Sequence, residues 1–439
     1  MKKILAMILA LAMCLSLAAC SGGGSKESQQ PSSNPGTTSQ APAEDGVKNV
    51  KIGVLLPFSG ASSYYAEHQF YGIKYALDHF LKNSDYDTSK LNIELVTADS
   101  TGTADVAVTE FERLVNEEKV NAVIGPYNSG AGAAIAPLAV KYKVPVMIVN
   151  AVSDIIMQEE NTYVYRTNLG DKDGNASYME FLRFMMALPG GGISKVAYVY
   201  ENSDYGTSMY NNQSTNVFPE LGIEVVLAEP FTSGSGDLSG VVNKVKASGA
   251  DMVMVCAFTE DAVLFTRQMA EYEVDVPIFG CGAGFSTEEY VQQAGDKAEY
   301  VLNTGSWLYS PESMSDEANE ICNAYMKEAN TTVPNETFAN GWLGMYSLLD
   351  AIYRADSAGR DDIAKALEAT DIPAGHPALM FHSTFGGIRY EDDGTRYNQN
   401  AFAGMMLAQF QGGKWEILSM DENTTLVWPV PTWAERAAG

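Results

Sequence analysis

The sequence is poor in cysteine, histidine and basic side chains. Only 5 cysteines and 4 histidines occur among 439 residues, too few and too scattered for a disulfide framework or a histidine-rich metal site. Lys and Arg number 28 against 55 Asp and Glu, so the formal net charge is −27. A surface this acidic repels phosphate backbones, which excludes nucleic acid as a partner. No metal or other cofactor is expected.

Motifs of known catalytic sites are also missing. Residues 48–439 contain no GxSxG, HExxH or SxxK arrangement that would combine a nucleophile or a metal with a base. The run from Gly280 to Gly284 is a weak GxGxG that does not open the first strand–helix unit, so a dinucleotide site is excluded as well. The sequence therefore favours a binding protein over an enzyme, and turnover of a ligand would contradict this interpretation.

The first 20 residues, MKKILAMILALAMCLSLAAC, combine two lysines with a short apolar run at 4–17. The run is shorter than the roughly 20 residues that a membrane-spanning helix needs, which favours a signal peptide over residues 1–19. The stretch Leu17 to Cys20 resembles the lipobox of bacterial lipoproteins, in which the cysteine carries the lipid. An ordinary signal peptide cut near Ala19, with Cys20 incidental, is the alternative.

Residues 20–47 consist mostly of Gly, Ser, Pro, Thr and Gln. Such a composition cannot bury a core and predicts a flexible tether with a reach of roughly 25–30 Å. The N-terminal part of the sequence thus predicts a protein that is lipid-anchored at Cys20 on the outer face of a bacterial cell membrane. In a Gram-negative cell this would be the periplasmic side.

From residue 48 on, short apolar runs rich in β-branched residues alternate with helical periodicities. The strand-like runs fall in two groups, at 50–56, 93–96, 120–124 and 144–149 and again at 196–200, 223–226, 252–255 and 276–279. Helical segments are expected near 66–83, 104–118, 203–218, 237–248, 260–272, 315–330, 337–356 and 360–369, and short strands near 383–391 and 401–410. Apolar strands alternating with amphipathic helices predict parallel sheets covered on both faces. Because the pattern restarts, the predicted fold class is α/β with two doubly wound lobes.

Ligands of open parallel sheets bind beyond the carboxyl ends of the strands, and one of these ends is distinctive. After the run 120–124, a glycine-containing loop leads to a helix expected to begin near Ser129. Free N–H groups at a helix start, together with a hydroxyl, form a small anion site. The loop lacks the GK[ST] of a P-loop, so a carboxylate fits better than a triphosphate. A plain helix cap at Ser129 is the alternative.

Four stretches resemble signature regions of periplasmic binding proteins of the leucine/isoleucine/valine type. They are VLLPFSG at 54–60, Gly72, VIGP at 123–126 and DYG at 204–206. The resemblance covers residues 48–439 with matching order and spacing. Members of this family are the substrate-binding subunits of ABC importers, and their two lobes close on one ligand.

The resemblance implies a type I periplasmic binding protein with three crossovers between its lobes. Lobe 1 would comprise residues 48–168 and 303–384, and lobe 2 would comprise residues 169–302 and 385–439. The expected protein is a monomer that delivers an amino acid or a related small carboxylate to ABC permease subunits in the membrane. A sensor that passes its signal to a membrane receptor without transport is the alternative, which the sequence does not separate from an importer.

The same resemblance assigns roles to individual residues. The ligand carboxylate would meet the loop at Asn128 and Ser129 and the next strand end at Ala151 and Ser153. The aromatic residues of the pocket would be Tyr65, Tyr205, Phe258 and Phe338.

One position departs from the family. Amino-acid-binding members carry an acidic residue after the strand at 276–279, where it pairs with the ligand's ammonium group, and Gly282 matches that position here. Acidic residues that could replace it are Glu67, Asp204, Glu260 and Asp261. An unpaired buried ammonium would cost several kcal/mol. The sequence therefore predicts weak binding of leucine, isoleucine and valine, with preference for a larger or less cationic carboxylate. An amino acid whose ammonium meets a carboxylate elsewhere is the alternative.

Overall fold

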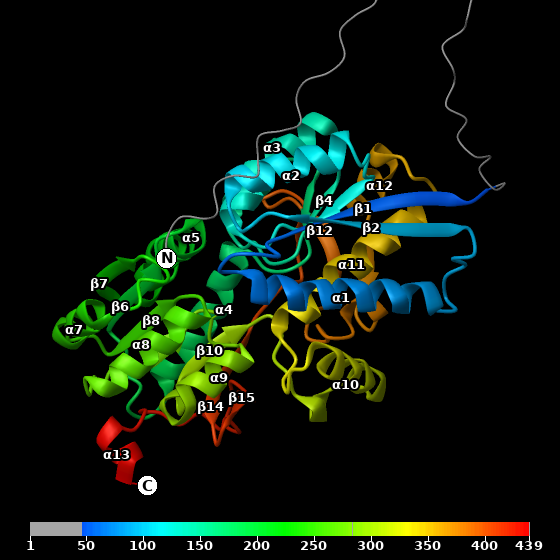
Figure 1. Ribbon diagram of the computed structural model, residues 1–439. Helices are drawn as coiled ribbons and strands as arrows, with labels where there is room; N and C mark the ends of the chain where they lie inside the picture. The colour runs from blue at the N-terminus through cyan, green and yellow to red at the C-terminus, as the bar shows by residue number, and fades with distance from the viewer. Residues whose placement is uncertain (1–45, 283, 439) are drawn as a thin grey trace, which may run out of the picture. The chain divides into compact units, whose positions relative to one another are not determined.

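The computed structural model describes residues 46–282 and 284–438, in which two sheets alternate with helices (Figure 1). The predicted signal peptide, Cys20 and nearly all of the predicted linker lie outside the described residues. Residues from Gly46 on belong to one compact unit. Within the described ranges, no helix combines the length and apolarity that crossing a bilayer requires.

The first sheet has eight strands in the order β11-β12-β13-β5-β4-β3-β1-β2. Strands β1 to β5 run parallel, and β12 pairs antiparallel with both β11 and β13. The strand bounds are β1 Lys48–Leu56, β2 Leu91–Asp99, β3 Ala122–Ile124, β4 Val146–Ile148, β5 Val164–Arg166, β11 Asp371–Pro373, β12 Gly387–Glu391 and β13 Gln399–Asn400. We call this sheet and the helices packed on it the first lobe.

The second sheet has seven strands in the order β15-β14-β10-β9-β8-β6-β7, and it forms the second lobe with its helices. Strands β6 to β10 are parallel, and β14 and β15 extend the sheet antiparallel at one edge. The strand bounds are β6 Lys195–Glu201, β7 Glu224–Phe231, β8 Met252–Cys256, β9 Ile278–Gly280, β10 Leu302–Gly305, β14 Met406–Gln411 and β15 Lys414–Ile417. The two doubly wound sheets confirm the predicted fold class.

Helices connect the strands of both lobes. The α-helices are α1 Ser63–Lys82, α2 Ala104–Asn116, α3 Ser129–Tyr142, α4 Asp171–Ala187, α5 Asp204–Asn216, α6 Phe218–Leu221, α7 Ser239–Ser248, α8 Thr259–Glu271, α9 Glu288–Ala294, α10 Asp316–Ala329, α11 Glu336–Ala355, α12 Arg360–Glu368 and α13 Trp433–Ala438. Short 3-10 turns are η1 Asp154–Met157, η2 Gly295–Ala298, η3 Pro311–Ser313 and η4 Pro377–Leu379.

The chain passes between the two sheets three times, after β5, after β10 and between β13 and β14. The third passage corrects the expected lobe boundary, because β12 and β13 fall in the range 385–439 that was predicted for lobe 2, yet they pair within the first sheet. Strand β10 is likewise in the second sheet, although lobe 1 was predicted to resume at 303. These strands are only two to five residues long, and segments this short carry no pattern that indicates which sheet they join.

Both faces of the first sheet are covered, and β1 shows why its sequence is continuously apolar. Val50, Ile52 and Val54 point into a core that they share with α1 and α11. Leu55 points into the opposite core, with α2 and α3. Figure 1 shows these two pairs of helices on opposite sides of the sheet. A strand buried on both faces needs apolar residues at consecutive positions.

Helices α1 and α11 pack closely because glycines lie at their contact. A Cβ atom at Gly72 would lie 2.0 Å from the carbonyl oxygen of Phe338, and one at Gly341 would lie 2.3 Å from that of Gln69. Side chains at these two positions would push the helices apart. The close contact holds the start of α11, at Glu336, in a fixed position relative to α1.

Candidate ligand-binding site

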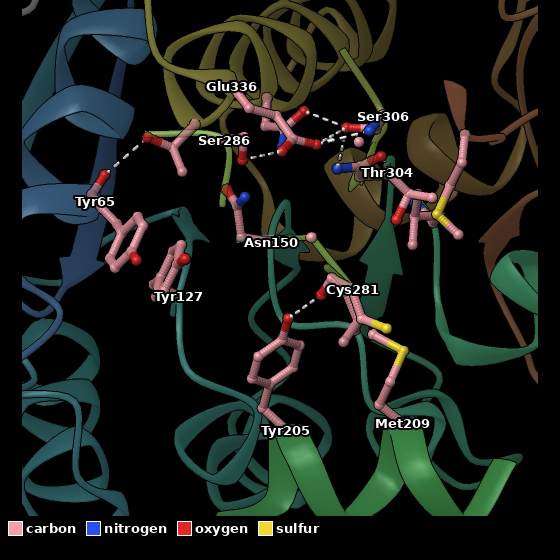
Figure 2. Close-up of a pocket in the computed structure, with 18 of the residues that line it drawn as sticks. Tyr65, Tyr127, Asn150, Tyr205, Met209, Cys281, Ser286, Thr304, Ser306 and Glu336 are labelled. Carbon is pink, nitrogen blue, oxygen red and sulfur yellow. Dashed lines mark hydrogen bonds between the residues drawn. The ribbon is translucent and has the colours of Figure 1, made fainter. Parts of the chain in front are cut away.

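A pocket lies beyond the carboxyl ends of strands from both sheets, where strand-end ligand sites were expected. Its 22 lining residues come from both lobes and from the segments that connect them. Five of the predicted site residues line it: Tyr65, Ser129, Tyr205, Phe258 and Gly282. Figure 2 shows Tyr65 and Tyr127 together on one wall, with Tyr205 and Met209 rising from a helix on another.

Aromatic rings form a continuous part of the pocket wall. Tyr65 stacks on Tyr127 with ring centroids 5.2 Å apart, and the Phe258 ring lies 5.9 Å from Tyr65 and 5.6 Å from Tyr205. The hydroxyl of Tyr205 donates a hydrogen bond of 2.8 Å to the carbonyl oxygen of Cys281, which fixes the ring. These rings present apolar faces to a ligand from both lobes.

The two lobes touch directly beside the pocket. The Tyr65 hydroxyl on α1 lies 2.6 Å from the Thr259 hydroxyl on α8 and accepts a hydrogen bond of 3.0 Å from the Thr259 backbone N–H. Tyr65 is only 3% exposed, and burial raises the pKa of its phenol. The phenol is therefore neutral at ordinary pH and acts as a hydrogen-bonding bridge between the lobes.

Helix α3 begins at Ser129, as predicted, and its first turn faces the pocket through that residue. The preceding residue, Asn128, makes no side-chain hydrogen bond that caps the helix. The Ser129 hydroxyl accepts a hydrogen bond of 3.4 Å from the backbone N–H of Ser153. A helix start with an adjacent hydroxyl favours an anionic group of a ligand.

In the loop after β4, Asn150 and Val152 line the pocket, whereas the predicted residues Ala151 and Ser153 are not among its lining residues. The buried guanidinium of Arg166 donates hydrogen bonds to the carbonyl oxygens of Ala151, Val152 and Ser153, at 3.3, 2.8 and 3.1 Å. One guanidinium nitrogen, Nη1, thus binds three successive carbonyl oxygens and holds the loop around it. Ser153 instead donates a hydrogen bond of 3.1 Å to Ser208 on α5.

Asn128 and Phe338 are also absent from the pocket lining. The side-chain amide of Asn128 donates a hydrogen bond of 3.0 Å to the Ser62 hydroxyl. Phe338 is 0% exposed and stacks on Tyr325 with centroids 4.0 Å apart, inside the core of the first lobe. Glu336, Thr337 and Asn340 of α11 line the pocket, whereas Phe338 packs into the core of the first lobe.

The sequence predictions missed Glu336, the first residue of α11. One carboxylate oxygen, Oε1, accepts hydrogen bonds of 2.7 Å from the backbone N–H and from the hydroxyl of Ser306. The other oxygen, Oε2, receives a longer bond of 3.4 Å from the Ser286 hydroxyl. Figure 2 shows these three residues on one side of the pocket. They join the start of α11, the segment after β10 and the segment after β9.

The environment of Glu336 changes its proton affinity. Burial raises the pKa of its carboxyl group, and the hydrogen bonds from Ser306 oppose that shift without cancelling it. Among the described residues that line the pocket, Glu336 is the only one with a formal charge, and none is Lys, Arg or His. The pocket thus contains one carboxylate and no cation of its own.

None of the four acidic residues considered from the sequence lines the pocket. Glu67, Asp204 and Glu260 are exposed, and Asp261 is buried where it accepts hydrogen bonds from Ser233 and Gly234. Gly282 does line the pocket, with φ at +86°. An acidic or other side chain at that position would be strained.

Cysteines and metal ligands form no reactive centre in the described residues. Cys256, Cys281 and Cys322 are buried and free, and burial raises the pKa of Cys281, which lines the pocket, to about 12. Its thiol is therefore protonated at ordinary pH. The same part of the chain contains no group of three or more His, Cys, Asp or Glu residues that could hold a metal ion.

Comparisons with known proteins agree with this architecture. A family model described as "Periplasmic binding protein" matches residues 49–414. The "Leu/Ile/Val-binding protein homolog 7" of Brucella abortus is 28% identical over 390 residues, which cover 85% of this chain and 92% of that protein.

Solved structures share the fold. The branched-chain amino acid transporter substrate binding protein LivJ of Streptococcus pneumoniae, in complex with isoleucine, has a TM-score of 0.70 at 23% identity, covering 84% of this chain and 99% of that one. A solute binding protein of an ABC transporter from R. palustris, in complex with benzoate, has a TM-score of 0.70 at 20% identity, covering 84% and 96%.

Proposed function

The chain belongs to the periplasmic binding protein family, and from this premise we propose that it captures an amino acid or a related small carboxylate for an ABC importer. The observation that carries the proposal is the pocket at the strand ends of both sheets. A ligand held there touches both lobes, so its binding energy stabilises the closed arrangement over an open one. Members of the family bind their substrates and are not enzymes.

The carboxylate of the ligand binds at the start of α3. Ser129 is the predicted residue whose hydroxyl faces the pocket there, and free N–H groups of the first helical turn add to it. The aromatic rings of Tyr65, Tyr205 and Phe258 enclose the rest of the ligand. Gly282 leaves space beside Tyr205, whose hydroxyl would lie 3.6 Å from a Cβ atom at that position.

The known ligands of similar proteins support a carboxylate. The S. pneumoniae protein holds isoleucine and the R. palustris protein holds benzoate. The two molecules differ in size, shape and charge, but both have a carboxylate group. A shared site for that group with a variable remainder of the pocket accounts for both.

A thermal-shift screen of the purified protein tests the proposal. The panel contains the common L-amino acids, aromatic and aliphatic carboxylates, and uncharged amides of the same carbon skeletons. A ligand at 100 times its dissociation constant adds about 2.7 kcal/mol to the free energy of unfolding, which shifts the melting temperature measurably. Stabilisation by carboxylates and not by the matched amides is expected. If only amides or no compounds stabilise the protein, the assigned ligand class is wrong.

The partners in the membrane are ABC permease subunits, and the anchor is a lipid on Cys20. The lipobox-like LAAC and the polar stretch at 20–47 support the anchor. Replacing Cys20 with Ala should release the folded protein from the membrane fraction, and retention of this variant in the membrane would contradict lipid anchoring. Uptake of the stabilising ligand should depend on this protein and on the permease. Uptake that is unchanged without the protein would favour the sensor instead.

A further inference from the structure

The pocket contains one negative charge, and a ligand that is a plain carboxylate would leave it without a cation. Glu336 is the single formally charged residue among the described residues that line the pocket. An acid without an amino group would bring a second negative charge next to this carboxylate, in a site where burial already disfavours one. A zwitterion would bring a cation as well. The charge of the pocket therefore separates amino acids from plain carboxylates.

Both short hydrogen bonds to the Glu336 carboxylate reach Oε1, and the backbone N–H of Trp307 also bonds to the carboxylate. Ser306 occupies Oε1 through two bonds of 2.7 Å, whereas the bond from Ser286 to Oε2 is 3.4 Å long. An ammonium group is a donor with three N–H bonds and forms short, charge-assisted bonds to such an oxygen.

A second acceptor lies on the same side of the pocket. Asn150 lines the pocket, and its Oδ1 atom is buried without a hydrogen-bond partner among the described residues. Figure 2 shows its amide pointing toward the part of the pocket where Ser286 and Glu336 lie. A buried acceptor without a donor costs free energy, and a second N–H of an ammonium group would satisfy it.

We propose that Glu336 on α11 receives the ammonium group of the ligand, and that the ligand is an amino acid with both charged groups bound to the first lobe. This inference rests on the proposed function and narrows its ligand class. The position that holds the acid in the family is in the second lobe and is Gly282 here, with a backbone conformation unsuited to a side chain. An ammonium partner in the first lobe would favour amino acids over the less cationic carboxylates expected from the sequence.

A purely structural role of Glu336 must be distinguished from ligand binding. As the first residue of α11, it also fastens Ser306, which follows β10 where the chain passes between the lobes. Glu336→Gln keeps an acceptor oxygen for Ser306, removes the charge and replaces the second acceptor oxygen with an NH2 donor. Glu336→Asp keeps the charge on a shorter side chain. Glu67→Gln makes the same change of net charge at an exposed site outside the pocket.

The experiment is calorimetric titration of the purified protein and these three variants with matched pairs of probes. The pairs are L-leucine with 4-methylpentanoate and L-phenylalanine with 3-phenylpropanoate, which differ only in the amino group. Wild type and Glu67→Gln should bind the amino acid of at least one pair at least tenfold more tightly than its partner. Glu336→Gln should weaken the binding of that amino acid by about tenfold or more, because one charge-assisted bond is lost. Its affinity for the deaminated partner should be unchanged or higher. Glu336→Asp should restore part of the affinity.

The outcomes separate this inference from the function on which it rests. Equal or tighter binding of the deaminated acids by wild type, or unchanged amino acid binding by Glu336→Gln, would overturn the role of Glu336 and leave carboxylate capture intact. If Glu336→Gln loses affinity equally for both members of a pair, Glu336 has a structural role, and its role in binding the ammonium group is overturned as well. Binding of neither pair by wild type would count against the proposed ligand class itself and against this inference with it.

Discussion

The two lobes contribute different chemistry to one pocket. The first lobe presents polar groups, namely the Ser129 hydroxyl, the Asn150 amide and the Glu336 carboxylate. The second lobe presents mainly aromatic and thioether side chains, among them Tyr205, Met209 and Phe258. Directional hydrogen bonds position a charged ligand, whereas apolar contact is not directional.

This difference indicates an order of events during binding. A ligand whose charged groups are matched by the first lobe can bind there while the lobes are apart, and the second lobe then covers it. Closure adds apolar contact and the hydrogen bonds between Tyr65 and Thr259. The first lobe would determine which charged groups are accepted, and the second lobe would determine how tightly they are enclosed.

The largest expected effect comes from removing a polar group of the first lobe. Ser129→Ala should weaken ligand binding by about 10-fold to 100-fold, because a hydrogen bond to a charged group contributes about 1.5–3 kcal/mol. The second-lobe change Ser286→Ala should cost less than half as much in free energy. Calorimetry measures both affinities, and thermal melts should show that both variants fold. Similar losses in the two variants would contradict the division between the lobes.

The pH dependence of amino acid binding tests the same division through Glu336. Its ionised form pairs with an ammonium group, and burial raises its pKa. Affinity should therefore be full above the raised pKa and fall as the pH drops through it, by up to about tenfold per pH unit. This fall should begin at a higher pH than for an ordinary glutamate. Titrations over a pH series should show this slope in wild type and none in Glu336→Gln.

The other titratable groups around Glu336 do not produce such a slope. Burial raises the pKa of each of three phenols, those of Tyr65, Tyr127 and Tyr205, above the ordinary value for tyrosine, so all three stay neutral. His382 lies behind Asn340, with Nε2 2.9 Å from Oδ1, and burial lowers the pKa of its imidazole to about 3. A slope that persists in Glu336→Gln would assign the titration to another group.

A smaller effect is expected from the contact between the lobes. Tyr65→Phe removes the hydroxyl that bonds to Thr259, at a cost of about 1 kcal/mol for one neutral hydrogen bond, or about fivefold in affinity. The dissociation rate should rise, because closure and not initial docking is weakened. Tyr75→Phe is the control, since its hydroxyl bonds to Glu328 on α10 away from the pocket. Equal dissociation rates for Tyr65→Phe and wild type would show that this bridge does not stabilise the closed form.

The smallest measurable change should be in the dimensions of the protein. Saturation with ligand should decrease the radius of gyration in solution scattering, since one molecule must contact both lobes. Ser129→Ala at the same ligand concentration should show a smaller decrease, in proportion to its occupancy. An unchanged radius at saturation would mean that the lobes are already closed without ligand.

Most of the fold could be predicted from the sequence where strands are buried on both faces. The runs at 196–200 and 252–255 became β6 and β8 within one residue at each end, because a doubly covered strand requires an unbroken apolar run. The predicted helix at 337–356 became α11, again within one residue at each end. Strand β11, at Asp371–Pro373, was missed because it has three residues and only Ile372 is buried.

A pocket residue could be predicted only where the sequence around it shows that it lies at the end of a strand or the start of a helix. Ser129 follows a strand and begins a helix, and both facts can be read from the sequence. The sequence did not indicate that Phe338 lies in the core, because a helix presents neighbouring residues in different directions and only packing against Tyr325 shows which direction is the core. Glu336 was missed because an acid at the start of a helix is a common stabilising feature and gives no indication that the helix begins at a pocket.

The sequence by itself determined the α/β class, the repeat of the strand–helix pattern into two lobes and the family, because these depend on the order of apolar and polar residues along the chain. Only the tertiary structure decided which sheet the late strands join and which carboxylate lines the pocket. Glu336 and Ser129 are more than 200 positions apart, yet both line one pocket. The close packing of α11 on α1, through Gly72 and Gly341, positions Glu336, and the end of β3 positions Ser129. Such a meeting depends on the packing of whole elements, which no local pattern of residues encodes.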